Sequence, residues 1–155
     1  MSKIVIVVCV AHCIERMFVM DPRIKELAHN LINYSCTVQP GEKVMIHVFG
    51  TSAYSLAQQL VKETYAVGGY PYVQIEDYEI NRAFIMGANE EQLKLKADLD
   101  MAQMKEMDAY IGIRASDNIA ELSDVPQDKL QLYTAMNNDV SVSYTHLTLP
   151  TMAVV

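Results

Sequence analysis

A chain of 155 residues is long enough for one domain with one core and is short for two. Its formal net charge of -7 argues against a surface that binds nucleic acid or an anionic membrane. A hydrophobic fraction of 51% excludes a disordered chain. Three cysteines, an odd number, favour a reducing cytoplasm over a disulfide framework.

The first 19 residues differ in character from the rest of the chain. An apolar run from Ile4 to Ala11 after one basic residue is typical of a short secretory signal, and it is too short to span a bilayer. The alternative, which we favour, is that translation starts at Met20. Residues 1–19 would then be a mis-assigned start, read in frame from upstream sequence.

From Met20 onward, predicted helices and strands alternate. Asp21 is a helix cap with Pro22 at the first helical position. One face of that helix is apolar, through Ile24, Leu27, Ala28, Leu31 and Ile32. A strand over 43–49 follows. A second helix opens at Gly50 and ends at Gly68, and its predicted apolar stripe is Ala53, Leu56, Ala57, Leu60, Val61 and Tyr65.

The second half of the body continues this pattern. A strand over 70–77 precedes a short helix over 80–86, and Asn89 with Gln92 resembles a capping box for a long helix to about Met107. A third strand covers 109–113, a capped helix starts near Ile119, and a last helix covers 127–136. Strands separated by helices predict a parallel sheet. We therefore expect an α/β domain over 20–140, with a small, mainly parallel sheet flanked by helices in three layers.

Residues 141–155 carry no charged side chain and follow neither the helical nor the strand pattern. The stretch 142–151 resembles the in-frame translation of a sequencing adapter. We therefore expect 141–155 to be an artefactual tail, with the natural polypeptide cut near 138–140.

The body shows no catalytic or metal-binding motif. Its two histidines are His29, at a polar helix position, and His47, which is predicted to pack inside a strand. Acidic residues in and beside the helix over 89–107 alternate with lysines, as on a solvated helix face: Glu90, Glu91, Asp98, Asp100, Glu106 and Asp108, with Lys94, Lys96 and Lys105. We expect neither a catalytic residue nor a metal ligand in this chain.

Two loops remain as candidate binding sites. Gly50 opens a helix directly after a strand, so backbone amides there could meet a nucleotide or a small anion, although no glycine-rich motif is present. Arg114 ends the third strand, at the edge where α/β sheets usually bind ligands. Asp117, Asp124 or a substrate carboxylate could pair with it. Arg114, Asp117 and Asn118 are our candidates for cleft or interdomain contacts, and the alternative is an arginine that only ties down its own loop.

Several stretches, in order, resemble the N-terminal part of the two-metal aminopeptidases typified by aminopeptidases T and S. They are Met-Asp-Pro-Arg-Ile-Lys-Glu-Leu-Ala from Met20, Gln-Pro-Gly-Glu-Lys-Val from Gln39, Gly-Gly-Tyr-Pro from Gly68, Met-Gly-Ala from Met86, and the run from Gln103 to Ile119. The likeness covers Met20 to about Tyr133 and includes no catalytic motif.

This resemblance implies a cytoplasmic metallopeptidase that removes N-terminal residues from peptides. Its two divalent metal ions, such as zinc, cobalt or magnesium, would activate water and polarise the scissile carbonyl. The metal ligands would lie in a C-terminal catalytic domain absent from this chain, and the parent would be a homodimer. We therefore expect an inactive N-terminal fragment, with a free-standing binding module or a secreted or anchored form as the alternatives.

Overall fold

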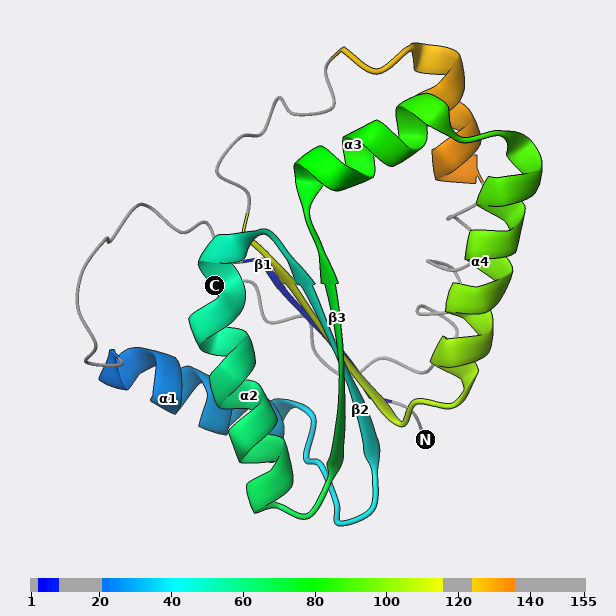
Figure 1. Cartoon of the computed structure of the whole chain (residues 1–155). Helices are drawn as coiled ribbons and strands as arrows, with labels where there is room; N and C mark the ends of the chain where they lie inside the picture. Colours follow the sequence, from blue (N-terminus) through cyan, green and yellow to red (C-terminus); the bar gives the residue numbers. More distant parts are fainter. Residues whose placement is uncertain (1–2, 9–20, 116–123, 136–155) are drawn as a thin grey trace.

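The computed structural model describes residues 3–8, 21–115 and 124–135, which form a sheet with helices on both faces (Figure 1). Its strands are β1 (Lys3–Val8), β2 (Lys43–Phe49), β3 (Tyr70–Glu76) and β4 (Ala109–Arg114). All pairs are parallel, in the order β1-β4-β2-β3. The predicted α/β class is confirmed. The sheet has one strand more than predicted, because β1 pairs along β4.

The helices connect these strands and lie on opposite sides of the sheet (Figure 1). On one side are α1 (Pro22–Asn30), which continues into the π-helical turn η1 (Leu31–Ser35), and α2 (Tyr54–Ala66), which follows the 3-10 turn η2 (Thr51–Ala53). The crossover from β3 to β4 contains α3 (Tyr78–Gly87) and α4 (Glu90–Lys105), and α4 lies on the other side. Residues 127–135 are also helical. None of the described helices is long and apolar enough to cross a membrane.

Local capping signals explain where these helices begin and end. Asp21 accepts a hydrogen bond from the Arg23 amide, and Asn89 accepts one from the Gln92 amide, so both predicted caps are confirmed. Asp77, predicted as the last residue of the preceding strand, instead caps α3. Gly68 follows α2 with a φ of +80°, the left-handed conformation that ends many helices.

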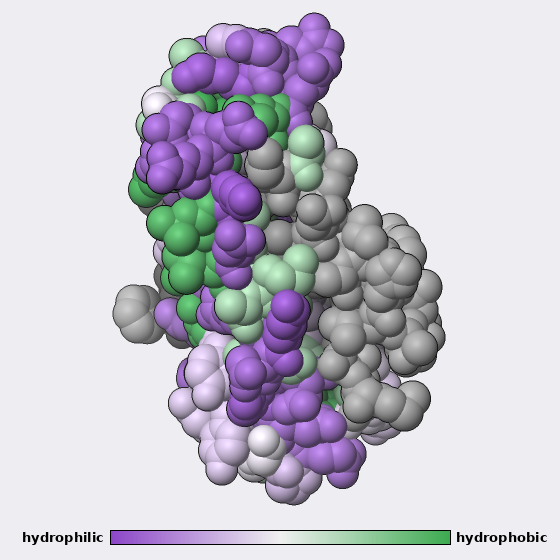
Figure 2. All heavy atoms as spheres, turned by 90° about the vertical axis from the view of Figure 1, so that its right-hand side faces the viewer, coloured by the Kyte–Doolittle hydropathy of each residue, from purple (hydrophilic) through white to green (hydrophobic). Residues whose placement is uncertain are grey.

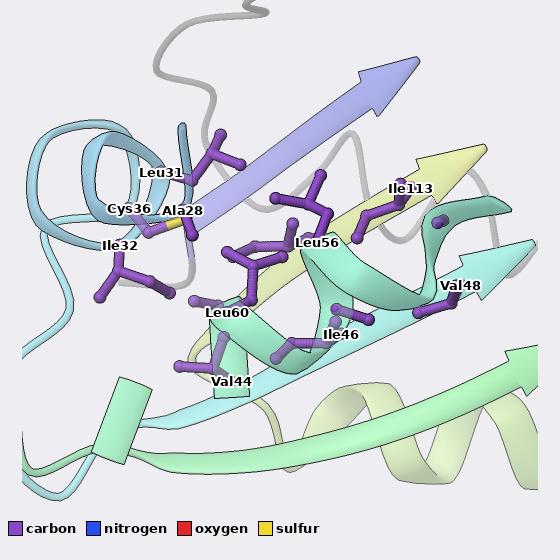
Figure 3. Packing of buried hydrophobic residues seen from close by; sticks show 14 of the residues in the cluster. Ala28, Leu31, Ile32, Cys36, Val44, Ile46, Val48, Leu56, Leu60 and Ile113 are labelled. Carbon is purple, nitrogen blue, oxygen red and sulfur yellow. The ribbon is translucent and has the colours of Figure 1, made fainter. Parts of the chain in front are cut away.

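The main core lies between the sheet and the α1–α2 side (Figure 3). Alternate residues of β2 and β4 point there, and the apolar faces of α1, η1 and α2 cover them. The largest fully buried side chains of this core are Ile32, Val44, Ile46, Val48, Leu60, Ile111 and Ile113. The predicted helix faces are confirmed except at Tyr65, whose side chain is 62% exposed, because it lies at the margin of the covered stripe.

The opposite side of the sheet has a much smaller apolar cluster, made of Met45, Met104, Met107 and Tyr110. Two of these come from β2 and β4, Met104 comes from α4, and Met107 follows it. Polar side chains, among them His47 and Lys96, fill much of the remaining space between this sheet face and α4. The molecule therefore has the three layers predicted from the sequence, with a substantial apolar core on one side only.

The edge of the sheet at β3 has a particular hydrogen-bonding pattern. The Tyr70 amide donates to the Glu42 carbonyl at 2.8 Å, and the Glu76 carbonyl accepts from the Gly50 amide at 3.0 Å. In a parallel strand such bonds involve alternate residues, so the residues between them direct their backbone groups away from β2. Pro71 is one of these outward residues, and it has no N–H to expose.

Candidate functional site

The loops at the carboxyl ends of β2 and β4 meet closely around Gly50. Its φ is +85°, and a Cβ built on it would lie 2.0 Å from the carbonyl oxygen of Ala115. The two strand ends are also joined by the Ala115 amide, which donates to the Phe49 carbonyl at 2.9 Å. Only glycine permits this approach of two backbones. The glycine thus has a structural reason to be at this position.

This geometry weakens the case for anion binding at Gly50. The Gly50 amide already donates to the Glu76 carbonyl, so it is not available to a ligand. The 3-10 turn that follows, η2 (Thr51–Ala53), continues directly into α2. The glycine amide that the sequence offered for anion binding is therefore occupied within the sheet edge.

Arg114 ends β4 with an exposed side chain. Its guanidinium carbon lies 5.3 Å from the centre of the Phe49 ring, its register partner on β2, which is a cation–π contact. The predicted partner Asp124 instead receives the guanidinium of Arg82. Of the three candidate contact residues, the structure places Arg114 at the sheet edge, while Asp117 and Asn118 lie outside the described residues.

Tyr78, at the start of α3, is electrostatically coupled to this edge. Burial raises the pKa of its hydroxyl, the Arg114 charge acts in the opposite direction, and the Glu76 charge raises it further. The net effect is a raised pKa, so the Tyr78 hydroxyl remains neutral. Its ring lies 6.1 Å from that of Phe49, which continues the aromatic surface beneath Arg114.

A second polar arrangement begins at His47, in the middle of β2 on the side of α4. Nδ1 of His47 lies 3.0 Å from the Tyr110 hydroxyl, and the imidazole stacks on Phe49 with 4.3 Å between ring centres. Nε2 of His47 is buried and lies 3.4 Å from a carboxylate oxygen of Glu76, too poorly aligned for a hydrogen bond. The prediction that His47 packs inside the strand is confirmed, and the residue also joins a polar network.

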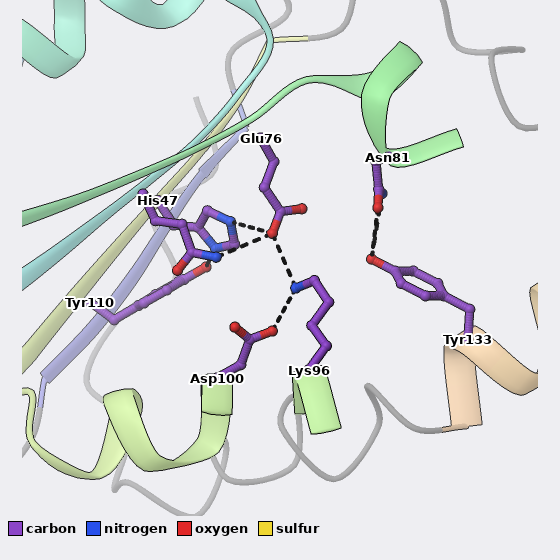
Figure 4. Close-up of polar contacts among 8 residues, drawn as sticks. His47, Glu76, Asn81, Lys96, Asp100, Tyr110 and Tyr133 are labelled. Atoms are coloured by element: carbon purple, nitrogen blue, oxygen red, sulfur yellow. Dashed lines mark hydrogen bonds and ion pairs between the residues drawn. The ribbon is translucent and has the colours of Figure 1, made fainter. Parts of the chain in front are cut away.

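Glu76 and α4 complete this network (Figure 4). Nζ of Lys96 lies 3.5 Å from Glu76 and 2.7 Å from Asp100, one turn further along α4. Burial by itself raises the pKa of Glu76, but the contacts with His47 and Lys96 outweigh it and hold the pKa below its ordinary value. Burial lowers the pKa of Lys96, and the carboxylates of Asp100 and Glu76 outweigh that effect and raise it. Glu76 and Lys96 are therefore a charged pair between the sheet and α4.

A small cavity lies beside the network. Polar side chains and two methionines of the small apolar cluster line it. The lining residues are Met45, His47, Gln74, Asp100, Gln103, Met104 and Tyr110. Its volume of about 20 Å³ suits a single water molecule. The cavity is thus a packing defect within a polar interface, too small for a substrate or a cofactor.

The described residues do not form a metal centre. No group of three or more histidine, cysteine, aspartate or glutamate side chains within 3–8, 21–115 and 124–135 is arranged to hold a metal ion. Where two carboxylates come together, at Glu76 and Asp100, the Lys96 ammonium already lies between them. A divalent cation would have to displace that charge, so these side chains do not fit a metal site.

Sequence reasoning missed this network because it treated Lys96 and Asp100 as part of a solvated helix face. That expectation is wrong for both, whose side chains are only 28% and 24% exposed. The signal was present in their spacing. Lys96 and Asp100 follow Leu93 at helical intervals and precede Met104, so all four lie on one face of α4. Glu76 gave no such signal, because its partners come from other elements.

These features define an α/β domain with an all-parallel sheet, an apolar core on one face and a charged network on the other. A family model of the thermophilic metalloproteases, M29, matches residues 20–149, and the chain belongs to this family. Among solved structures, it is similar to wild-type AmpT from Thermus thermophilus, with a TM-score of 0.65 and 19% sequence identity. That similarity covers 86% of this chain and 35% of the AmpT chain, so the chain spans about a third of AmpT's length. No curated protein matches it.

Proposed function

We propose that this chain is the N-terminal domain of a metal-dependent aminopeptidase, an enzyme that hydrolyses N-terminal residues from peptides. The observation that carries the proposal is the match of residues 20–149 to the thermophilic metalloproteases. The similarity in fold to AmpT, over about a third of that chain, is consistent with a role as one part of a longer enzyme. The odd number of cysteines supports a cytoplasmic location.

In this proposal the metal ions are held outside the described residues. The described part of the chain has no suitable ligand cluster, and its central carboxylates are bound to Lys96. The domain's contribution would be positional, since Arg114 and Tyr78 lie at the carboxyl edge of the sheet, where a neighbouring domain or a peptide can reach them. We assign no catalytic step to any described side chain.

Two preparations test the proposal. The first is the 155-residue chain alone, and the second is the full product of the encoding gene, established by a long read across its reading frame. We expect the second to release amino acids from a leucine anilide in the presence of Zn²⁺ or Co²⁺ and to lose that activity in EDTA, while the first is inactive with the same metals. An inactive full product, or equal activity of the short chain, would contradict the proposal.

A further inference from the structure

The attachment of α4 differs from that of the other long helix. Of the sixteen residues of α4, only Leu93 and Met104 are buried. Leu95 and Leu99, one turn apart, are 60% and 62% exposed. Figure 2, which views the molecule from the α4 side, shows hydrophobic and hydrophilic side chains mixed over this face. By contrast, α2 buries five residues, and three of them, Leu56, Ala57 and Leu60, belong to the main core.

Charged contacts attach α4 to the sheet where apolar packing is sparse. The Lys96 ammonium bridges Asp100 on its own helix to Glu76 on β3, and Glu76 in turn contacts His47 on β2. The side chains of His47 and Glu76 are 13% and 15% exposed, and those of Lys96 and Asp100 are 28% and 24% exposed, so this chain of contacts is largely shielded at its Glu76 end. A shielded ion pair is costly to leave half-broken, because the remaining charge stays buried. The loss of charge on Glu76 would therefore weaken the whole attachment.

One end of α4 is fixed independently of this network. Asp108, just beyond the helix, accepts a hydrogen bond at 2.9 Å from the Lys43 amide at the start of β2. Lys43 also reaches Glu106 with its ammonium group at 3.2 Å. The helix therefore has a hinge at its carboxyl end and a charged contact in its middle.

We propose that α4 is a hinged cover, held closed over the sheet by the Glu76–Lys96–Asp100 bridge and released when Glu76 is protonated. Release exposes the buried side chains of Met45 and Tyr110 and uncovers the partly buried His47, while the main core stays intact because α1 and α2 lie on the other face. The charged and titratable groups that surround this bridge come from every neighbouring element: His47, Tyr78, Lys96, Asp100, Arg114 and Tyr133. This device does not depend on the proposed peptidase activity.

Native-state hydrogen exchange on the 155-residue chain tests the cover. In the wild-type protein at pH 7, we expect α4 amides to exchange faster than those of β2, and with a weaker dependence on added urea, because opening the cover exposes less surface than unfolding. The change Glu76→Gln removes the charge and keeps the shape. It should speed exchange in α4 on the order of ten- to a hundredfold more than in β2.

Two controls make the test specific. Glu76→Asp keeps the charge and should restore part of the protection. Lys94→Met removes an exposed lysine from the same helix and should leave α4 exchange unchanged, whereas Lys96→Met should raise it as Glu76→Gln does. The proposal is overturned if wild-type α4 and β2 exchange together in one cooperative unit. An equal response to Lys94→Met and Lys96→Met would also overturn it. If Glu76→Gln does not fold, the wild-type urea dependence decides the question alone.

Discussion

The hydroxyl of Tyr110 lies 3.0 Å from Nδ1 of His47 although the two residues are not register partners. The partner of His47 on β4 is Gly112, and the tyrosine ring leans over that glycine to reach the imidazole. A Cβ at Gly112 would lie 3.1 Å from a ring carbon and 3.2 Å from the hydroxyl oxygen. The absence of a side chain at one position thus allows a hydrogen bond between two others.

Tyr110→Phe tests the value of this hydrogen bond. The ring remains, but the partly buried Nδ1 of His47 loses its partner, so we expect a loss of ~1–3 kcal/mol in the free energy of unfolding, measured by urea denaturation. Tyr34→Phe is the control, because the Tyr34 side chain is 72% exposed, and it should change stability by less than ~0.5 kcal/mol. Equal effects of the two changes would show that the bond contributes nothing.

Gly50→Ala should be strongly destabilising. The new methyl group would collide with the Ala115 carbonyl oxygen, and the φ of +85° disfavours any residue with a side chain. We expect a loss of more than ~3 kcal/mol, seen as a lower urea midpoint. The matched change Gly87→Ala, in α3 and with open space around it, should be neutral or stabilise by up to ~1 kcal/mol. A mild effect at Gly50 would mean that the two loops separate easily.

Alanine substitutions at two leucines test how much the main core and the outer face of α4 each contribute to stability. Leu60 is fully buried between α2 and the sheet, so Leu60→Ala should cost about 2–5 kcal/mol of unfolding free energy. Leu99→Ala removes the same atoms from a side chain that is 62% exposed, and it should cost less than ~0.5 kcal/mol. A large loss at Leu99 would instead reveal that its side chain is covered in solution, for example by association.

Acid should weaken the fold through Glu76. Its pKa in the folded protein is below the ordinary value of 4.5, so the folded state binds this proton less readily than the unfolded state. The stability that it contributes is present above pH 4.5 and is lost as the pH falls through the lower, folded-state value. Unfolding midpoints measured from pH 7 downward should fall more steeply in the wild type than in Glu76→Gln. Parallel curves for the two proteins would contradict this expectation.

Much of the fold could be predicted because its signals are local. Asp21 and Asn89 mark helix starts, Gly68 marks a helix end, and the apolar run of β2 indicates a buried strand. The contacts of Glu76 could not be predicted in the same way, because they join residues 20 and 29 positions away on other elements. The local pattern also predicts that Tyr65 is buried, and it is exposed, because the width of the buried face of α2 depends on how that helix packs.

The candidate site shows the same division. The position of Arg114 at the end of a buried strand could be predicted from the order of apolar and polar residues, and the structure places it there. Its contact with Phe49 depends on the register between β2 and β4, which no local motif specifies. The pairing of Asp124 with Arg82 likewise depends on the packing of α3 near residues 124–135.

Pro71 has a further consequence at the open edge of the sheet. The exposed side chains of Val73 and Ile75 would make β3 an attractive template for a strand from another molecule. An incoming strand needs a ladder of outward donors, and Pro71 removes one of them near the start of β3. The outward donors that remain on β3 are those of Val73 and Ile75. We therefore expect this single imino acid to disfavour the addition of a strand at this edge.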